Sequence, residues 1–312
     1  MQGMCEKTMS KKEFLKLIVS KMEFIGLRDG TELTIKIEQE NHNGVIKDGI
    51  LLISKKDNYA LFCSLPEFEE NQFDVECAEE NAGRVAKAVL GIFENNNTNG
   101  KNATEALKTW ENAQEALLPV LYSRETFKKM NVDCPHRYFF DLVICYQLFA
   151  ERISEIKGTI FITNEMAEEF AVNEEVLFQK AMENMKKATF VDSVSKTRIS
   201  KRRCNHDCCM GCDGETAELY VIRCNAKYGD GALLNAQRLN ELAKEIGTKR
   251  LAIIPSSLHE CLLVDGENID VSALRELVRY NNKTKVSEED ILSYSLYFYD
   301  VKKGYGIYEK GE

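Results

Sequence analysis

The sequence lacks the features that mark most membrane, secreted and nucleic-acid-coating proteins. No apolar run approaches the roughly 18 to 20 residues that a membrane span requires, and the segment 1–10 has no secretory signal. The 312 residues include 41 Lys and Arg against 50 Asp and Glu, so the formal net charge is −9. A general affinity for nucleic acid is therefore disfavoured. These absences predict a cytoplasmic globular protein.

Motifs of the common cofactor and hydrolase classes are also missing. The sequence contains no G-x-x-x-x-G-K-[ST] phosphate loop, no G-x-G-x-x-G dinucleotide loop and no G-x-S-x-G nucleophile turn. His259 and Glu260 are adjacent, but no second histidine follows at the spacing of the H-E-x-x-H zinc motif. No cofactor of these classes is expected, and the sequence favours a non-catalytic protein over such enzymes.

Hydrophobic periodicity predicts an α+β fold with mixed or antiparallel sheets, packed helices and room for two subdomains. Apolar residues three or four apart predict a helix over 11–27, with Ser10 as its N-cap. Alternation then predicts a hairpin over 33–53 that turns at Asn43-Gly44. The last third alternates between expected strands and helices, namely strands 219–224, 251–255, 260–264 and 294–299 and helices 231–246 and 271–281.

A polar segment divides the chain into two expected regions. Residues 95–103 are rich in Asn and cannot bury an apolar face, so they predict a linker. The expected N-terminal region, 1–94, holds the first helix and the hairpin. The expected C-terminal α+β domain, 104–312, carries a Cys-rich loop at 192–216.

Five of the soft metal-ligand side chains are crowded into that loop. A chain of this size without an export signal predicts reduced thiols rather than a disulfide framework. The spacing Cys209-x-x-Cys212 can present two sulfurs to one zinc ion, although structural zinc sites usually draw their ligand pairs from more distant segments. A zinc site, a redox dithiol and a loop with incidental thiols all stay open. The candidate zinc ligands are Cys204, His206, Cys208, Cys209 and Cys212.

A basic run precedes the thiols. Its five cations could contact phosphates beside a zinc-tied loop, but no aromatic side chain is interleaved for base stacking. A solvated basic loop is the simpler interpretation. The candidate nucleic-acid contacts are Lys196, Arg198, Lys201, Arg202 and Arg203.

Two histidine-containing strings could carry catalysis if the fold brought them into one cleft. A histidine would then act as general base and Arg137 would hold an anion, as in a hydrolase-like enzyme. The structural alternative is that the serines cap a turn and that Arg137 forms an ion pair that fixes a loop. The candidate catalytic residues are His136, Arg137, Asp141, Ser257, His259 and Glu260.

The same strings carry a family resemblance. Residues 135–142 read P-H-R-x-F-x-D-L, residues 162–164 read I-T-N and residues 255–260 read P-S-S-x-H-E. Together they resemble an uncharacterised domain family of gut-dwelling Gram-positive bacteria that is often carried on mobile elements. The resemblance implies a shared fold over about residues 130–300 and no particular activity. The chain departs from it at Tyr294, where the family has Asp, and at the thiol-rich loop.

Three functions follow as expectations. The first is a non-catalytic cytoplasmic accessory protein that binds another protein. The second is a small-molecule enzyme that uses the strings around His136 and His259. The third is a zinc-stabilised nucleic-acid contact through residues 196–212, with zinc as the one candidate cofactor.

Overall fold

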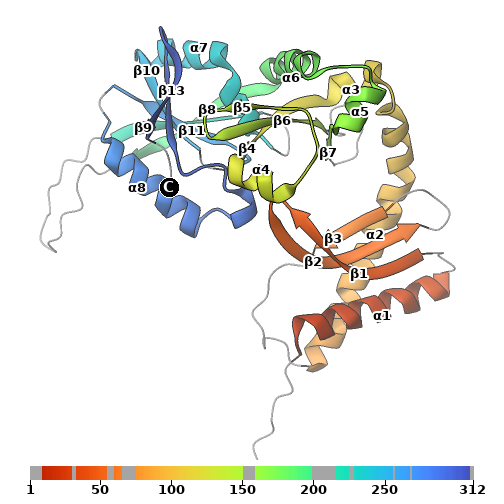
Figure 1. Ribbon diagram of the computed structural model, residues 1–312. Helices are drawn as coiled ribbons and strands as arrows, with labels where there is room; N and C mark the ends of the chain where they lie inside the picture. Colours follow the sequence, from red (N-terminus) through yellow and green to blue (C-terminus); the bar gives the residue numbers. More distant parts are fainter. Residues whose placement is uncertain are drawn as a thin grey trace, which may run out of the picture. The chain divides into compact units, whose positions relative to one another are not determined.

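The computed structural model describes residues 9–29, 33–54, 60–64, 75–149, 159–198, 216–224, 228–255, 257–267 and 269–309. The chain divides into two compact units, residues 1–105 and 106–312. Every strand pairing in the described ranges is antiparallel, and helices pack on sheets in both units (Figure 1). The predicted α+β class is confirmed.

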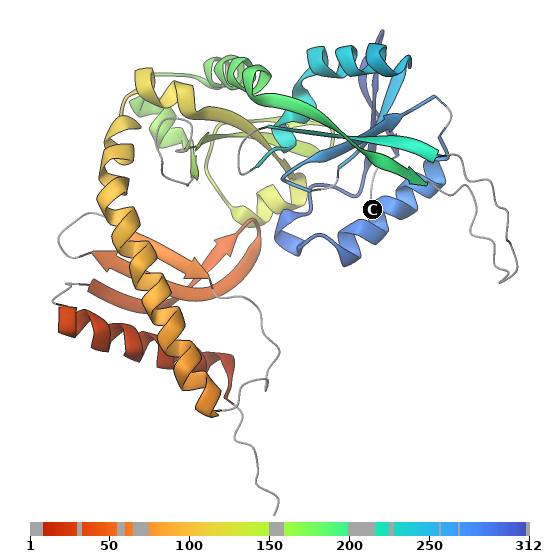
Figure 2. The same cartoon turned by 180° about the vertical axis from the view of Figure 1, so that it is seen from behind.

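The first unit is a three-stranded sheet with two helices on one face (Figures 1 and 2). Its strands lie in the order β1-β2-β3. Inward-facing side chains of β1 and β2 meet the apolar faces of both helices, so Ile18, Met22, Ile50, Leu52 and Phe93 are almost completely buried. The elements are α1 (Lys11–Asp29), β1 (Leu33–His42), β2 (Val45–Ser54), β3 (Ala60–Ser64) and α2 (Val75–Ala106).

Two local sequence signals explain how this unit begins. Ser10 caps α1 as predicted, because its Oγ accepts a hydrogen bond from the Glu13 amide while the Ser10 amide donates to the Glu13 carboxylate. The hairpin turns at Asn43 and Gly44, whose φ angles are 52° and 86°. Both residues tolerate the left-handed region, and two such residues form the turn that matches strand twist. The predicted helix and hairpin are confirmed.

The polar segment 95–103 differs from the expected linker, because it is helical and continues α2. Helix nucleation is costly, whereas elongation adds one hydrogen bond per residue. A helix already formed over the amphipathic stretch 82–93 can therefore extend through residues of poor helix propensity. The two compact units divide after Glu105 rather than within the Asn-rich segment.

The second unit contains two antiparallel sheets. One has six strands in the order β13-β12-β10-β11-β9-β8, and the other has the order β4-β6-β5, with β7 also paired to β6. Its elements are α3 (Trp110–Ala116), β4 (Leu117–Ser123), α4 (Arg124–Met130), β5 (His136–Phe139), β6 (Leu142–Phe149), β7 (Thr159–Phe161), α5 (Asn164–Glu169), α6 (Glu174–Ala188), β8 (Thr189–Arg198), β9 (Thr216–Cys224), η2 (Asp230–Leu234), α7 (Ala236–Ile246), β10 (Arg250–Ile254), β11 (Cys261–Asp265), α8 (Val271–Thr284), η3 (Glu288–Asp290), β12 (Leu296–Asp300) and β13 (Gly304–Glu309).

The six-stranded sheet is covered on both faces (Figures 1 and 2). Ala252 and Ile254 of β10 point to α8, where they meet Leu274. The alternate residues Leu251 and Ile253 point to the opposite face, in the larger core that includes α7 and the four-stranded sheet. Burial on both faces explains why these strands read as continuous apolar runs rather than as alternating patterns.

The expected helix 231–246 is divided in the structure. Residues 230–234 form the short helix η2, and Asn235 then caps α7 by accepting a hydrogen bond from the Arg238 amide at 3.1 Å. Gly231 explains the position of η2, because a Cβ there would lie 2.2 Å from the carbonyl oxygen of Pro119 in β4. Gly247 ends α7 with a φ of 77°, as its sequence position predicts.

Candidate functional site

Five of the six candidate catalytic residues line three hollows of the second unit, and Arg137 lines none of the three. His136 lines one hollow, Asp141 lines another, and Ser257, His259 and Glu260 line a third. The three hollows share no lining residue. The hypothesis of one catalytic cleft therefore gains no support from this arrangement.

The first hollow lies where the start of β5 meets the segments around α5 and the start of α6. It has a volume of about 590 Å³. Residues of the strings P-H-R and I-T-N both line this hollow, and the Asn164 amide donates a hydrogen bond to the carbonyl oxygen of Asp133, two residues before Pro135, at 3.1 Å. The His136 ring is held by its Nδ1, which lies 2.9 Å from the carbonyl oxygen of Cys134, and by packing on Phe127 at 4.7 Å between ring centroids.

Arg137, the next residue of β5, is engaged in an ion-pair network with α6. Its Nε and Nη2 donate to the two carboxylate oxygens of Glu174 at 2.7 and 2.6 Å, and Nη2 also donates to Glu175 at 2.8 Å. The guanidinium lies over the Phe178 ring at 3.6 Å, and Tyr146 donates a hydrogen bond to Glu174. A guanidinium with this many partners fastens β5 to α6 and has little capacity left for a substrate anion.

The protonation behaviour of Glu174 follows from these contacts. Burial acts to raise the pKa of its carboxyl group, but the hydrogen bonds from Arg137 and Tyr146 outweigh burial and hold the pKa below its ordinary value of 4.5. A lowered pKa in the folded state stabilises the fold above the unfolded-state pKa, and this contribution is lost as the pH falls through the folded-state pKa. The network therefore supports the fold at neutral pH.

Replacing Arg137 with Ala is expected to destabilise the second unit by about 2 kcal/mol at pH 7, because Glu174 would keep its partly buried charge without its bidentate partner. Arg137→Lys retains the charge but loses the fork, so it is expected to recover only part of this loss. Urea unfolding, followed by fluorescence of the single tryptophan at Trp110, measures both variants. Equal stability of all three proteins would contradict this role for Arg137.

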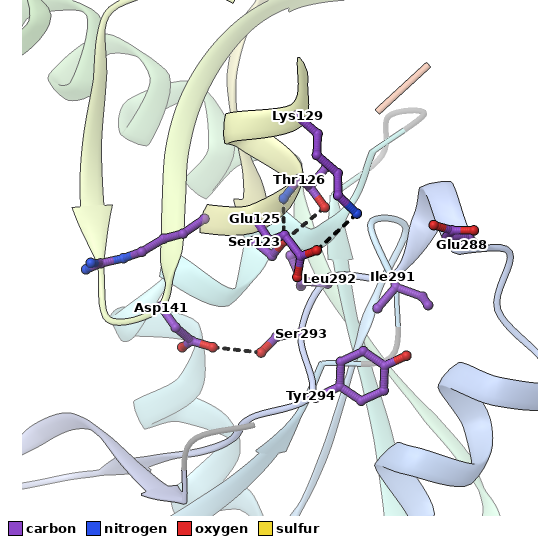
Figure 3. Close-up of a pocket in the computed structure, with 11 residues that line it drawn as sticks. Ser123, Glu125, Thr126, Lys129, Asp141, Glu288, Ile291, Leu292, Ser293 and Tyr294 are labelled. Carbon is purple, nitrogen blue, oxygen red and sulfur yellow. Dashed lines mark hydrogen bonds and ion pairs between the residues drawn. The ribbon is translucent and has the colours of Figure 1, made fainter. Parts of the chain in front are cut away.

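The second hollow lies between α4 and the segment that precedes β12 (Figure 3). It also has a volume of about 590 Å³. Asp141 points toward Ser293 at one side of the hollow, and Tyr294 lines it nearby. The charged side chains of α4 are partly paired, since Lys129 lies 3.0 Å from Glu125.

The Asp141 carboxylate is almost fully occupied by hydrogen bonds within the protein. Oδ2 accepts from the hydroxyls of Ser293 and Ser295 at 3.0 and 2.7 Å, and Oδ1 accepts from Tyr297 at 2.7 Å. Burial and the charge of Asp141 raise the pKa of Tyr297, so this phenol stays protonated and donates. Asp141 thus joins the β5–β6 turn to β12 rather than presenting a charge to solvent.

The third hollow surrounds the connection between β10 and β11 and has a volume of about 460 Å³. The Ser257 hydroxyl is nearly buried and accepts a hydrogen bond from the His259 amide at 3.1 Å. The His259 ring stacks on Tyr228 at 6.0 Å, and its Nε2 lies 3.5 Å from Asp290 of η3. The Ser257 amide donates to the Glu260 carbonyl oxygen at 3.1 Å, so this string forms a turn in which the serine engages backbone.

The candidate zinc and nucleic-acid segment is only partly within the described structure. The five soft ligands and the cations at 201–203 lie outside the described residues, and Lys196 and Arg198 are described only as backbone of β8. In the described part of the chain, no group of three or more His, Cys, Asp or Glu side chains could hold a metal ion. The described helices include none that is long and apolar enough to cross a membrane.

The model of one protein family, a family of unknown function (DUF5688), matches residues 11–301 of this chain. The chain belongs to this family. No curated protein and no solved structure matches the chain. The DUF5688 match spans both compact units, so the family comprises the N-terminal sheet and helices as well as the larger α+β unit.

Exposed aromatic residues at the β5–β6 hairpin were missed by the sequence analysis of this DUF5688 protein. Tyr138 is 62% exposed and Phe140 is 37% exposed. Arg124 links the two, because its guanidinium lies 4.6 Å from the centroid of the Tyr138 ring and donates to the Phe140 carbonyl oxygen. Phe140 adopts a φ of 55°, which is uncommon for a bulky residue. A signal was present, since Phe140 occupies a turn position where Asn or Gly would be expected and a second aromatic residue, Tyr138, precedes it by two positions.

Proposed function

We propose that this protein is a non-catalytic binding protein that contacts another protein through the β5–β6 hairpin. We call the exposed side chains Arg124, Tyr138 and Phe140 the hairpin patch. The observation that carries the proposal is the contrast between this patch and the polar residues of the family strings. The side chains of Arg137 and Asp141 form hydrogen bonds and ion pairs within the fold, whereas the rings of Tyr138 and Phe140 beside them are exposed to solvent.

The residue types of the hairpin patch, and the contacts that already hold its side chains in place, fit a protein interface. Tyr and Arg are enriched among residues that dominate binding free energies, and aromatic rings supply contact area at a low entropic cost. Arg124 holds the patch before a partner arrives, because it stacks on Tyr138 and binds the turn carbonyl of Phe140. Side chains fixed in this way lose less conformational freedom on binding. The proposal retains the cytoplasmic location that the sequence predicts and the accessory role on a mobile element that the family resemblance implies.

The hydrolase-like alternative has weaker support. Nucleophilic catalysis requires a hydroxyl, a base and an orienting group in mutual hydrogen-bond reach. Ser257 instead accepts a hydrogen bond from the His259 backbone, and the His259 ring is directed to Tyr228 and Asp290. His136 lines a different hollow from this group.

The test compares proteins that co-purify with the full chain and with two variants from a lysate of the cells that make it. The double variant Tyr138→Ser with Phe140→Asn removes both rings, and Asn tolerates the left-handed backbone at 140. Tyr280→Ser is the matched control, since Tyr280 is a similarly exposed tyrosine on α8, 58% accessible. At least one protein is expected to be recovered with the wild type and the control and to fall about tenfold or more with the double variant.

Unfolding curves from Trp110 fluorescence establish that all three chains are folded. A partner recovered equally well by the double variant would contradict the proposed surface. Absence of any specifically recovered protein, in an experiment with the wild type at high expression, would contradict the proposed function.

A further inference from the structure

We propose that the edge of β5 binds an extended peptide segment of the partner and that the first hollow receives a lysine or arginine side chain of that segment. This inference rests on the proposed function and adds the chemistry of the partner. Three observations carry it: the edge position of β5, the lining of the hollow, and the exposed Tyr138 on the same strand.

The backbone of β5 is suited to pairing with another strand. β5 pairs with β6 on one side and is the last strand of its path in the sheet. The register places Phe139 opposite Leu142, with a two-residue turn between them. In such a hairpin the residues that flank the turn hydrogen bond each other, so the N–H and C=O groups of His136 and Tyr138 point away from β6. An added peptide strand would use these groups, as in other proteins that bind peptides at a sheet edge.

The first hollow adjoins the start of this strand and has the lining expected for a long basic side chain. Apolar groups of Pro135, Ala167 and Val172 can contact the methylene stem, and carboxylates can bind the cationic head. No Lys or Arg is among the lining residues that the structure describes. The lining residues are Asp133, Cys134, Pro135, His136, Asn164, Ala167, Glu168, Val172, Asn173 and Glu174.

The three carboxylates of the hollow are not equivalent. Glu174 is bound to Arg137, and Asp133 accepts a hydrogen bond from the Asn164 side chain. Glu168 is exposed on α5, and among the described residues its carboxylate has no hydrogen-bond or ion-pair partner. Glu168 is therefore the group best placed to pair with an incoming cation. This charge also disfavours a nucleic-acid phosphate at the same place.

The position of Tyr138 adds a requirement for spacing in the peptide. His136 lines the hollow and Tyr138 lies two residues farther along β5, a rise of about 7 Å in an extended strand. A side chain paired across from Tyr138 lies about 5 Å from it and gains most if it is apolar. The peptide is therefore expected to carry an apolar and a basic residue roughly two to four positions apart.

The test selects peptides from a random nonapeptide phage library on the immobilised full chain. Enriched sequences are expected to contain Lys or Arg at the stated spacing from an apolar residue. A synthetic peptide of an enriched sequence, carrying a fluorescent label, is then titrated in polarisation experiments. Glu168→Lys is expected to weaken its binding at least tenfold, whereas Glu169→Lys, an exposed neighbour on α5 that does not line the hollow, is expected to change it less than threefold.

Hydrogen exchange of the complex distinguishes edge pairing from a purely electrostatic attraction. Bound peptide is expected to slow exchange of the Tyr138 amide. The inference is overturned if no peptide is enriched, if basic residues are not selected, if the two Lys variants act alike, or if the Tyr138 amide is unaffected. The proposed function is judged separately by the partner that depends on Tyr138 and Phe140, so it can survive failure of this peptide test.

Discussion

Asp141→Ala is expected to destabilise the second unit by about 3–5 kcal/mol, the largest single loss predicted here. The substitution leaves the hydroxyls of Ser293, Ser295 and Tyr297 without their shared acceptor. These three side chains are at most 4% exposed, so each hydroxyl left without its acceptor carries a desolvation cost. Urea unfolding followed by the fluorescence of Trp110 measures the change.

Two variants make this experiment specific. Asp141→Asn retains one oxygen acceptor and is expected to lose less stability than Asp141→Ala. Asp192→Ala is a matched control, because Asp192 is 59% exposed and its ion pair with Arg223 is long, at 3.5 Å; its removal should change stability by less than about 0.5 kcal/mol. If Asp141→Ala were as mild as Asp192→Ala, Asp141 would not be a structural fastener, and the case against a catalytic role would lose its main support.

Asp230→Asn is expected to remove most of the loss in folding stability that the ionisation of Asp230 causes as the pH rises. Asp230 is completely buried in η2, and its Oδ2 accepts a hydrogen bond from the Leu121 amide at 3.0 Å. Burial raises the pKa of Asp230 well above its ordinary value of 3.8, and the backbone N–H donors, that of Leu121 first, offset only part of this. Between the unfolded-state and folded-state pKa values, the unfolded chain releases a proton that the folded chain retains. The folded state thus loses up to about 1.4 kcal/mol of stability per pH unit over that interval.

The measurement is the difference between the unfolding free energies of Asp230→Asn and the wild type from pH 4 to pH 8. Asparagine cannot ionise, so this difference should increase in favour of the variant as the pH rises from about 4. The network around Glu174 titrates in both proteins and cancels in the difference. A difference that stayed constant over this interval would show that Asp230 has no raised pKa in the folded protein.

Local patterns predicted those parts of the fold that depend on nearest neighbours. Ser10, Asn43 and Gly44 each act within three or four residues of themselves, and their helix start and turn were confirmed. The extent of α2 was not predictable in the same way, because helix elongation depends on the preceding turns as well as on the residues added. The break before α7 likewise depends on Pro119, which is more than a hundred residues from Gly231.

The candidate site was predictable in residue type but not in arrangement. The string around Arg137 and Asp141 stood out because it places a histidine, an arginine and a carboxylate close together in sequence, the residue types that general-base catalysis and anion binding use. Their partners Glu174 and Ser295 lie 37 and 154 residues away and carry no local signal. The exposure of each side chain could not be predicted from the sequence either, since Tyr138 and Tyr146 belong to neighbouring strands but only Tyr138 faces solvent. Contacts between residues far apart in sequence therefore decide which polar side chains are bound within the fold and which remain exposed.

The distance in sequence between Asp141 and its partners also has a consequence during synthesis. Ser293 follows Asp141 by 152 residues, which a ribosome adds in roughly 8–30 s at typical rates of elongation. Throughout this time the β5–β6 turn carries a carboxylate whose hydrogen-bond donors, the hydroxyls of Ser293, Ser295 and Tyr297, have not yet been made. The first unit can complete its core well before then. The period in which the second unit is still incomplete is therefore the time at which this protein most needs a chaperone.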